Sequence, residues 1–128
     1  MDMKIEQSEL AELVRAFHLM WGHYPEPAQL AYKNREIIVL NAASESVGQV
    51  KGKKCSSCGT PEVHKGCLAN QAISTQQPVF RKNKYGDREA VAYWMPVDGY
   101  PDLFVHFSMG VIIDYDKTPA VVPGVRQL

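Results

Sequence analysis

The sequence predicts one domain of the α+β class, a five-stranded antiparallel sheet with helices on one face and an amphipathic helix at the N-terminus. Two periodicities predict this class. Apolar residues between positions 5 and 24 recur at spacings of three and four, whereas residues 103–114 alternate strictly between two sides. Turn-forming residues divide much of the remaining chain into short β-rich runs. The length of 128 residues fits a single core.

The N-terminal helix is expected over residues 5–24, and Gly22 with Pro25 and Pro27 is expected to end it. The apolar stripe of this helix predicts that it packs either against its own sheet or against a second copy of the chain. The stripe consists of Leu10, Leu13, Val14, Phe17, Met20, Trp21 and Tyr24.

Two short strands, 28–33 and 36–41, are expected to form a hairpin around Asn34 and Arg35. A short helical turn should follow before Gly48. The next helix should begin at Thr60, because Thr60 can cap it and Pro61 suits its first position. This helix is expected to run to about Thr75, where Pro78 follows.

The last third of the chain predicts three antiparallel strands. Residues 79–97 read as two strands around a turn at 85–87, and a second turn is expected at 98–102. In residues 103–114, Leu103 and Val105 face one side and Phe104 and His106 the other. His106 is expected to meet the N-terminal helix or a dimer partner.

Charge and composition argue against several functions. Fourteen basic and fourteen acidic residues give no net charge, so neither nucleic acid nor an anionic membrane is an expected partner. No signal peptide or membrane span is recognisable, and three crowded cysteines do not make a secreted disulfide framework, so we expect a cytoplasmic protein with reduced thiols. No phosphate-binding loop, dinucleotide motif or nucleophile elbow occurs, and we expect no enzymatic activity.

The stretch KGKKCSSCGTPEVHKGC contains a candidate metal site, Cys55, Cys58, His64 and Cys67. A helix from Thr60 would place His64 and Cys67 on one face. With two loop thiolates they would make a tetrahedral set for zinc or ligands for an iron–sulfur cluster. Two alternatives stay open. The cysteines beside several lysines could form a redox-sensing thiol pair, or they could be small buried residues without a ligand.

Several segments resemble the PAS domain, a small sensor fold. LAYKNREIIVLNAASESVG resembles the opening hairpin and helix of that family, and VKGKKC resembles a step common in its bacterial members. GCLANQAISTQQPV resembles the long helix and the turn before the third strand, and AYWMPVDGYPDLFVHFSMGVIID resembles the last two strands. The resemblance covers residues 28–116, which leaves 1–27 as an N-terminal helix and 117–128 as a tail.

The resemblance implies a sensory or signal-transduction module. Such a module binds a small ligand or cofactor between the inner face of its sheet and the helices, or it forms a homodimer, here through the N-terminal helix. The chain lacks the Asn-Cys-Arg-Phe motif of the flavin-binding subclass, so covalent flavin photochemistry is not expected. Eight strand residues are expected to face the helices, either as a ligand pocket or as plain core. They are Tyr32, Ile37, Val39, Tyr93, Met95, Val105, Phe107 and Met109.

Overall fold

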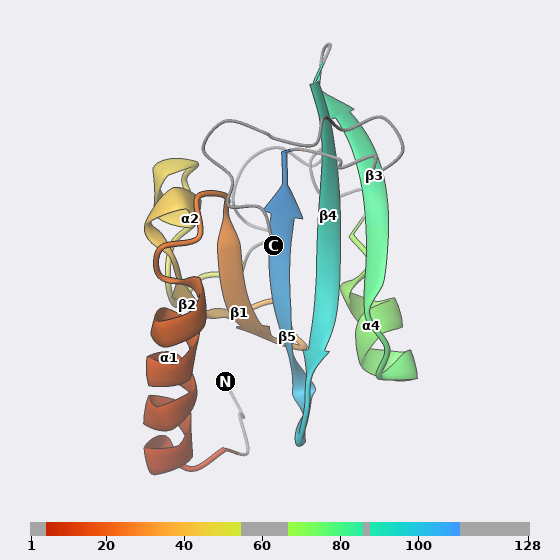
Figure 1. Ribbon diagram of the computed structural model, residues 1–128. Coiled ribbons are helices and arrows are strands. Elements are labelled where there is room, and N and C mark those ends of the chain that lie inside the picture. Colours follow the sequence, from red (N-terminus) through yellow and green to blue (C-terminus); the bar gives the residue numbers. More distant parts are fainter. Residues whose placement is uncertain (1–4, 55–66, 86–87, 111–128) are drawn as a thin grey trace, which may run out of the picture.

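The computed structural model describes residues 5–54, 67–85 and 88–110, which form an antiparallel sheet of five strands in the order β2-β1-β5-β4-β3 (Figure 1). The predicted α+β class and the five strands are confirmed. The elements are α1 (Gln7–Trp21), β1 (Ala28–Tyr32), β2 (Ile37–Leu40), α2 (Ala42–Ser46), α4 (Ala69–Thr75), β3 (Val79–Tyr85), β4 (Arg88–Val97) and β5 (Tyr100–Met109). None of the described helices is long and apolar enough to cross a membrane.

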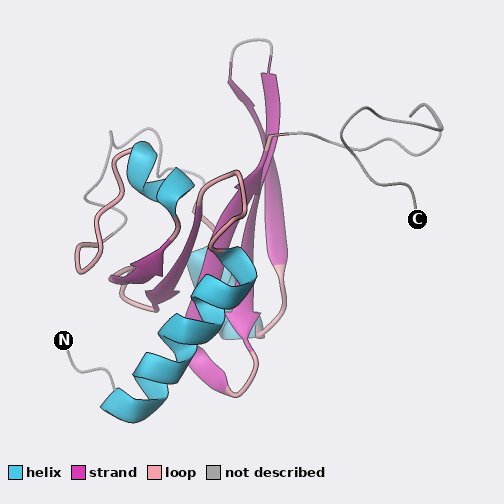
Figure 2. Ribbon diagram, turned by 60° about the vertical axis from the view of Figure 1, so that its left-hand side comes forward, coloured by secondary structure: helices cyan, strands magenta, loops and turns pink. Residues whose placement is uncertain are grey.

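Helices α1 and α4 lie on opposite faces of the sheet (Figure 2). We call the face under α1 the outer face and the face that carries α4 and α2 the inner face. On the outer face, Phe17 of α1 is buried in a cluster with Leu30, Leu103 and Val105. The apolar stripe of α1 therefore packs against its own sheet, which is one of the two predicted alternatives.

Helix α1 is shorter than predicted, because it ends at Trp21, with Gly22 at its C-cap. Met20 was assigned to the apolar stripe, but it lies on the far side of the helix from the sheet. Leu19 and Met20 are 73% and 78% exposed. They leave an apolar patch on the outward side of α1.

The hairpin of β1 and β2 turns at Asn34 and Arg35, as predicted. The side chain of Asn34 accepts a hydrogen bond of 2.8 Å from the backbone N–H of Glu36, and Arg35 adopts a positive φ of 79°. After α2 the chain returns to the free edge of β2. There the N–H of Gly52 donates to the carbonyl of Ile37 at 2.8 Å, and Ile37 donates to Lys53 at 2.9 Å.

Helix α4 begins at Ala69, whereas the helix start predicted at Thr60 lies outside the described residues. Cys67 and Leu68 precede it outside any helix or strand, so the helix predicted over residues 60–75 is not continuous. Its buried residues Ala69 and Ala72 pack on Trp94 and Phe104 of the inner face. Two alanines have no bulk beyond Cβ, so the helix backbone approaches the two aromatic rings closely.

Strands β4 and β5 are joined by a tighter turn than predicted, because Val97 already pairs with Tyr100. Only Asp98 and Gly99 remain in the loop, and Gly99 has a φ of 82°, which glycine adopts without strain. On the outer face, ring contacts run across the sheet to the end of α1. They join Phe80 to Tyr93, Tyr93 to Phe107, and Phe107 to Trp21 and Tyr24.

Candidate functional site

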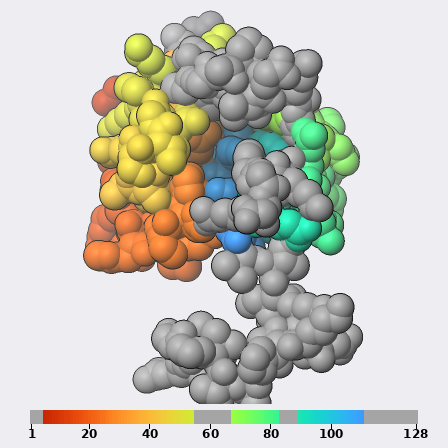
Figure 3. Space-filling model, turned by 90° about the horizontal axis from the view of Figure 1, so that it is seen from above, coloured from red at the N-terminus to blue at the C-terminus, as the bar shows by residue number. Residues whose placement is uncertain are grey.

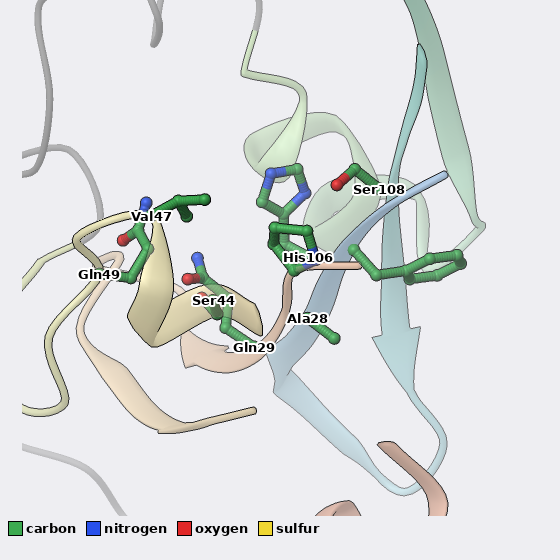
Figure 4. A pocket seen from close by; sticks show the side chains of 9 residues that line it. Ala28, Gln29, Ser44, Val47, Gln49, His106 and Ser108 are labelled. Carbon is green, nitrogen blue, oxygen red and sulfur yellow. The ribbon is translucent and has the colours of Figure 1, made fainter. Parts of the chain in front are cut away.

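A small cavity lies on the inner face between α2, β1 and β5 (Figure 4). Its volume is about 70 Å³. Figure 3 shows the molecule from above, at the end of the sheet nearest α2. In this view, atoms of β5 (blue) lie between α2 (yellow) and strands β3 and β4 (green to cyan). The described residues that line the cavity are Pro27, Ala28, Gln29, Ser44, Val47, Gln49, His106, Phe107 and Ser108.

Strand register brings the polar residues of this wall together. Gln29 of β1 lies opposite His106 of β5, which lies opposite Trp94 of β4. The rings of His106 and Trp94 are stacked at 4.5 Å between centroids. A carbonyl only accepts, so Nδ1 of His106 donates to the backbone carbonyl of Tyr93 at 2.8 Å. The imidazole is therefore held in one orientation at the cavity wall.

His106 was expected to contact either α1 or a dimer partner. The first alternative is wrong, because His106 faces the side of the sheet away from α1. The residues that flank it, Val105 and Phe107, point to the outer face where α1 packs, so alternation turns His106 to the inner face. Ser108 shares that face and lines the same cavity.

Two buried amide atoms of the cavity lining have no hydrogen-bond partner among the described residues. They are Nε2 of Gln29 and Oε1 of Gln49. The Gln29 side chain lies within a strand whose five residues are all buried, and Gln29 itself is 3% exposed. An unsatisfied buried polar atom costs about 1–3 kcal/mol. In Figure 4, Gln29 and Ser44 lie between Gln49 on one side and His106 on the other.

Asn41 ties the wall of the cavity to the end of α1. Its Oδ1 accepts from the backbone N–H of Ser44 at 2.9 Å, which caps α2, and from that of Ala28 at 3.1 Å. Its Nδ2 lies within hydrogen-bonding distance of three backbone carbonyls. These belong to Trp21 at 3.3 Å, Tyr24 at 3.1 Å and Glu26 at 3.0 Å.

Tyr24 makes a second tie between α1 and the cavity. Its phenol donates a hydrogen bond of 2.6 Å to the backbone carbonyl of Ser108. Burial of the phenol, and to a smaller degree the neighbouring Glu26 carboxylate, raises the pKa of Tyr24 above its ordinary value. The hydroxyl therefore remains a donor at neutral pH.

The eight residues predicted to line a ligand pocket lie mostly under α1. Tyr32, Val39 and Val105 belong to the buried outer-face cluster, and Met95 and Phe107 pack against it. Tyr93 stacks on Phe107, Met109 lies opposite Val91, and Ile37 packs with Leu40. Of the eight, Phe107 alone is among the residues that line the inner-face cavity. Whether the set binds a ligand stays a prediction.

Sequence reasoning missed Gln29, Ser44 and Gln49 as residues of the cavity. One signal for Gln29 was present, since it is a polar residue inside an apolar strand. Ser44 and Gln49 carry no such signal, because serine in a short helical turn and glutamine in the polar loop after it are both ordinary.

Of the predicted metal ligands, Cys55, Cys58 and His64 lie outside the described residues. Cys67 is a free thiol, partly buried, and packs against the inner-face cluster of Trp94 and Phe104. Cys67 precedes α4 and is not helical, whereas the prediction placed it on one face of a helix with His64. Within the described ranges no three side chains of metal-ligand type come together. The zinc or iron–sulfur site stays a prediction.

Comparison of the sequence with models of protein families and with curated proteins finds no match. The fold, in contrast, matches solved structures. The PAS domain of BvgS from Bordetella pertussis has a TM-score of 0.60 and 16% identity, over 82% of this chain and 90% of that one. A sensory box sensor histidine kinase from Vibrio cholerae has a TM-score of 0.56 and 11% identity, over 88% of this chain and 100% of that one.

A domain of an HTR-like protein from Haloarcula marismortui is also similar, with a TM-score of 0.57 and 18% identity, over 69% of this chain and 99% of that one. Identities this low show likeness of fold. The chain has the PAS fold, and the resemblance noted in its sequence is confirmed at that level.

Proposed function

We propose that this PAS-fold chain is a sensory module that binds a small molecule in the inner-face cavity and passes the bound state on to α1. The observation that carries the proposal is the pair of buried amide atoms, Gln29 Nε2 and Gln49 Oε1, which line one cavity without partners among the described residues. A bound molecule would satisfy both atoms and remove their desolvation cost. The likeness to the BvgS PAS domain and to a sensor histidine kinase supports a role in signalling.

The route from the cavity to α1 runs through Asn41 and Tyr24. Asn41 caps α2, which contributes Ser44 to the cavity, and the same side chain holds the carbonyl of Trp21, the last residue of α1, and that of Tyr24 just after it. Tyr24 holds Ser108 on another wall. A ligand that moves α2 or the end of β5 therefore acts on the C-terminal end of α1 through hydrogen bonds.

We assign no catalytic residue. The described lining contains no carboxylate, lysine or arginine, and its histidine is held by a backbone carbonyl. Such a lining suits recognition of a molecule better than proton transfer to it.

A thermal-shift screen with a small-molecule library, together with mass spectrometry of compounds that copurify, tests the proposal. A ligand present at 100 times its Kd stabilises the folded state by about 2.7 kcal/mol, and this stabilisation raises the Tm measurably. The shift should shrink in Gln29→Leu and persist in Lys33→Ala, since Lys33 is exposed and distant from the cavity. Compounds that stabilise the parent and the Gln29→Leu variant equally would contradict the proposal.

We also propose that two copies associate through the outward side of α1. The apolar stripe of α1, including Phe17 and Trp21, packs on the sheet of the same chain, so it is not the surface that a second copy would meet. Leu19 and Met20 are instead the large apolar side chains that α1 leaves exposed. Their burial against the same patch of a second copy would remove both from water.

A further inference from the structure

We propose that the cavity takes a compact, uncharged molecule that carries a hydrogen-bond acceptor next to a donor, and that a primary carboxamide is the simplest such group. This inference rests on the proposed function and names the class of ligand. It follows from the donor and acceptor inventory, the charge and the size of the cavity.

The two atoms without a partner among the described residues are of opposite kinds. Gln29 Nε2 is a donor and Gln49 Oε1 is an acceptor. A ligand carbonyl oxygen would accept from Gln29, while a ligand N–H would donate to Gln49. A carboxamide offers both on one carbon. A ketone or an ether offers an acceptor only and would leave Gln49 unsatisfied.

The charge of the lining selects against ions. The described lining residues include no aspartate, glutamate, lysine or arginine. An ion moved from water into such a site loses its hydration without gaining an opposite charge, which is far more costly than burial of a neutral polar group. His106 already donates through Nδ1 to Tyr93, so that hydrogen is not available to a carboxylate ligand.

The volume limits the ligand to a few heavy atoms. A cavity of about 70 Å³ has room for about five water molecules, or for a small organic molecule of similar size. Pro27 and Val47 supply an apolar part of the lining. A short alkyl group attached to the carboxamide fits this mixture of polar and apolar surface.

The test is a titration of the ¹⁵N-labelled chain followed by NMR, with four probes of matched size: propionamide, propionate, propylammonium and butanone. We expect propionamide to shift the backbone signals of Gln29, Ser44 and Gln49. Propionate and propylammonium should bind at least tenfold more weakly than propionamide, because each buries an unpaired charge. A tenfold difference in Kd corresponds to about 1.4 kcal/mol of binding free energy. Butanone should bind about three- to tenfold more weakly than propionamide, because it forms one hydrogen bond fewer.

Two variants and a matched control complete the test. Gln29→Met and Gln49→Met keep the length of the side chain and remove its hydrogen bonds, and each should weaken propionamide binding about three- to tenfold. Gln77→Met changes an exposed glutamine outside the cavity and should leave binding unchanged. Neither cavity variant should lower the Tm of the free protein, since each removes a buried atom for which the described part of the chain provides no hydrogen-bond partner. If both variants lower the Tm and propionamide does not bind, the glutamines serve a hydrated structural network and the inference is overturned.

The outcomes also separate this inference from the proposed function. Binding of propionate at the cavity in preference to propionamide would overturn the ligand class and leave the sensory role standing. So would a library compound of another class that stabilises the chain through Gln29. If neither the probes nor any library compound perturbs the cavity residues, both proposals are wrong.

Discussion

The side-chain oxygen of Asn41 lies 3.1 Å from the backbone nitrogen of Ala28, and the hydrogen bond between them joins the cap of α2 to the first residue of β1. Asn41 is 2% exposed, and the same side chain reaches the carbonyl of Trp21 at the end of α1 and those of Tyr24 and Glu26 between α1 and β1. Three elements therefore meet at one buried amide. The stability of the fold should depend strongly on this residue.

Asn41→Asp should destabilise the chain more than Asn41→Ala. Alanine removes the α2 cap and the other hydrogen bonds of the side chain, which we expect to lower the free energy of unfolding by about 3 kcal/mol. Aspartate keeps an acceptor for Ser44 and Ala28 but turns a carboxylate oxygen toward three carbonyls. Urea unfolding measures both effects. Ser46→Ala, at an exposed position of α2, should change stability by less than about 0.5 kcal/mol, and a similar small effect at Asn41 would contradict the assignment.

Tyr24→Phe should lower the free energy of unfolding by about 1 kcal/mol at neutral pH, since it removes the hydrogen bond to Ser108. The pKa of Tyr24 is raised in the folded state, so its contribution is fully present below the unfolded value of 10.0. It is lost as the pH rises from there through the folded pKa. Unfolding measured between pH 8 and 11 should show a smaller alkaline loss of stability in Tyr24→Phe than in the parent. Equal losses of stability in the two chains would show that the pKa of Tyr24 does not change on unfolding.

Leu19→Glu combined with Met20→Glu should convert a dimer into a monomer without unfolding it, because both side chains are exposed. Phe17→Ala, one turn away on the same helix but 4% exposed, should instead cost about 3–5 kcal/mol of stability. Light scattering at micromolar concentration gives the oligomeric state, and thermal unfolding gives the stability. A parent chain that is monomeric at those concentrations would remove the dimer proposal.

If Cys55, Cys58, His64 and Cys67 hold zinc or an iron–sulfur cluster, anaerobically purified protein should contain about one metal site per chain. Zinc would appear in elemental analysis, and a cluster would also absorb visible light. Cys67→Ser should then reduce the bound metal, because it removes one thiolate ligand. His18→Ala, at an exposed histidine of α1, is the matched control. Metal-free protein without visible absorbance would exclude both kinds of site.

Strand alternation predicted the sheet well. Leu103, Val105 and Phe107 share a face in the structure, as their spacing of two requires. Alternation does not say which helix covers that face. The apolar stripe of α1 and the small residues of α4 can each pack against an apolar face of a sheet. For that reason most of the predicted pocket residues lie under α1, and the cavity lies on the other side.

The continuous helix predicted over residues 60–75 is wrong at Cys67 and Leu68, since helical propensity is a local preference that tertiary packing can override. The contacts of Ala69 and Ala72 with the sheet decide where α4 packs. Asn41 and Gln29 were hard to identify for a related reason. Each owes its role to partners or neighbours that are distant in sequence, such as Trp21 for Asn41 and His106 for Gln29.

The two tryptophans of the chain lie on opposite faces of the sheet, Trp21 against Phe107 and Trp94 against His106. Intrinsic fluorescence can therefore be resolved face by face. In a Trp21→Phe variant, the remaining emission comes from an indole stacked on a cavity-lining imidazole. That emission would follow occupancy of the inner face, while Trp21 in the complementary Trp94→Phe variant would follow the packing of α1. The chain thus contains an optical reporter for each end of the proposed signal.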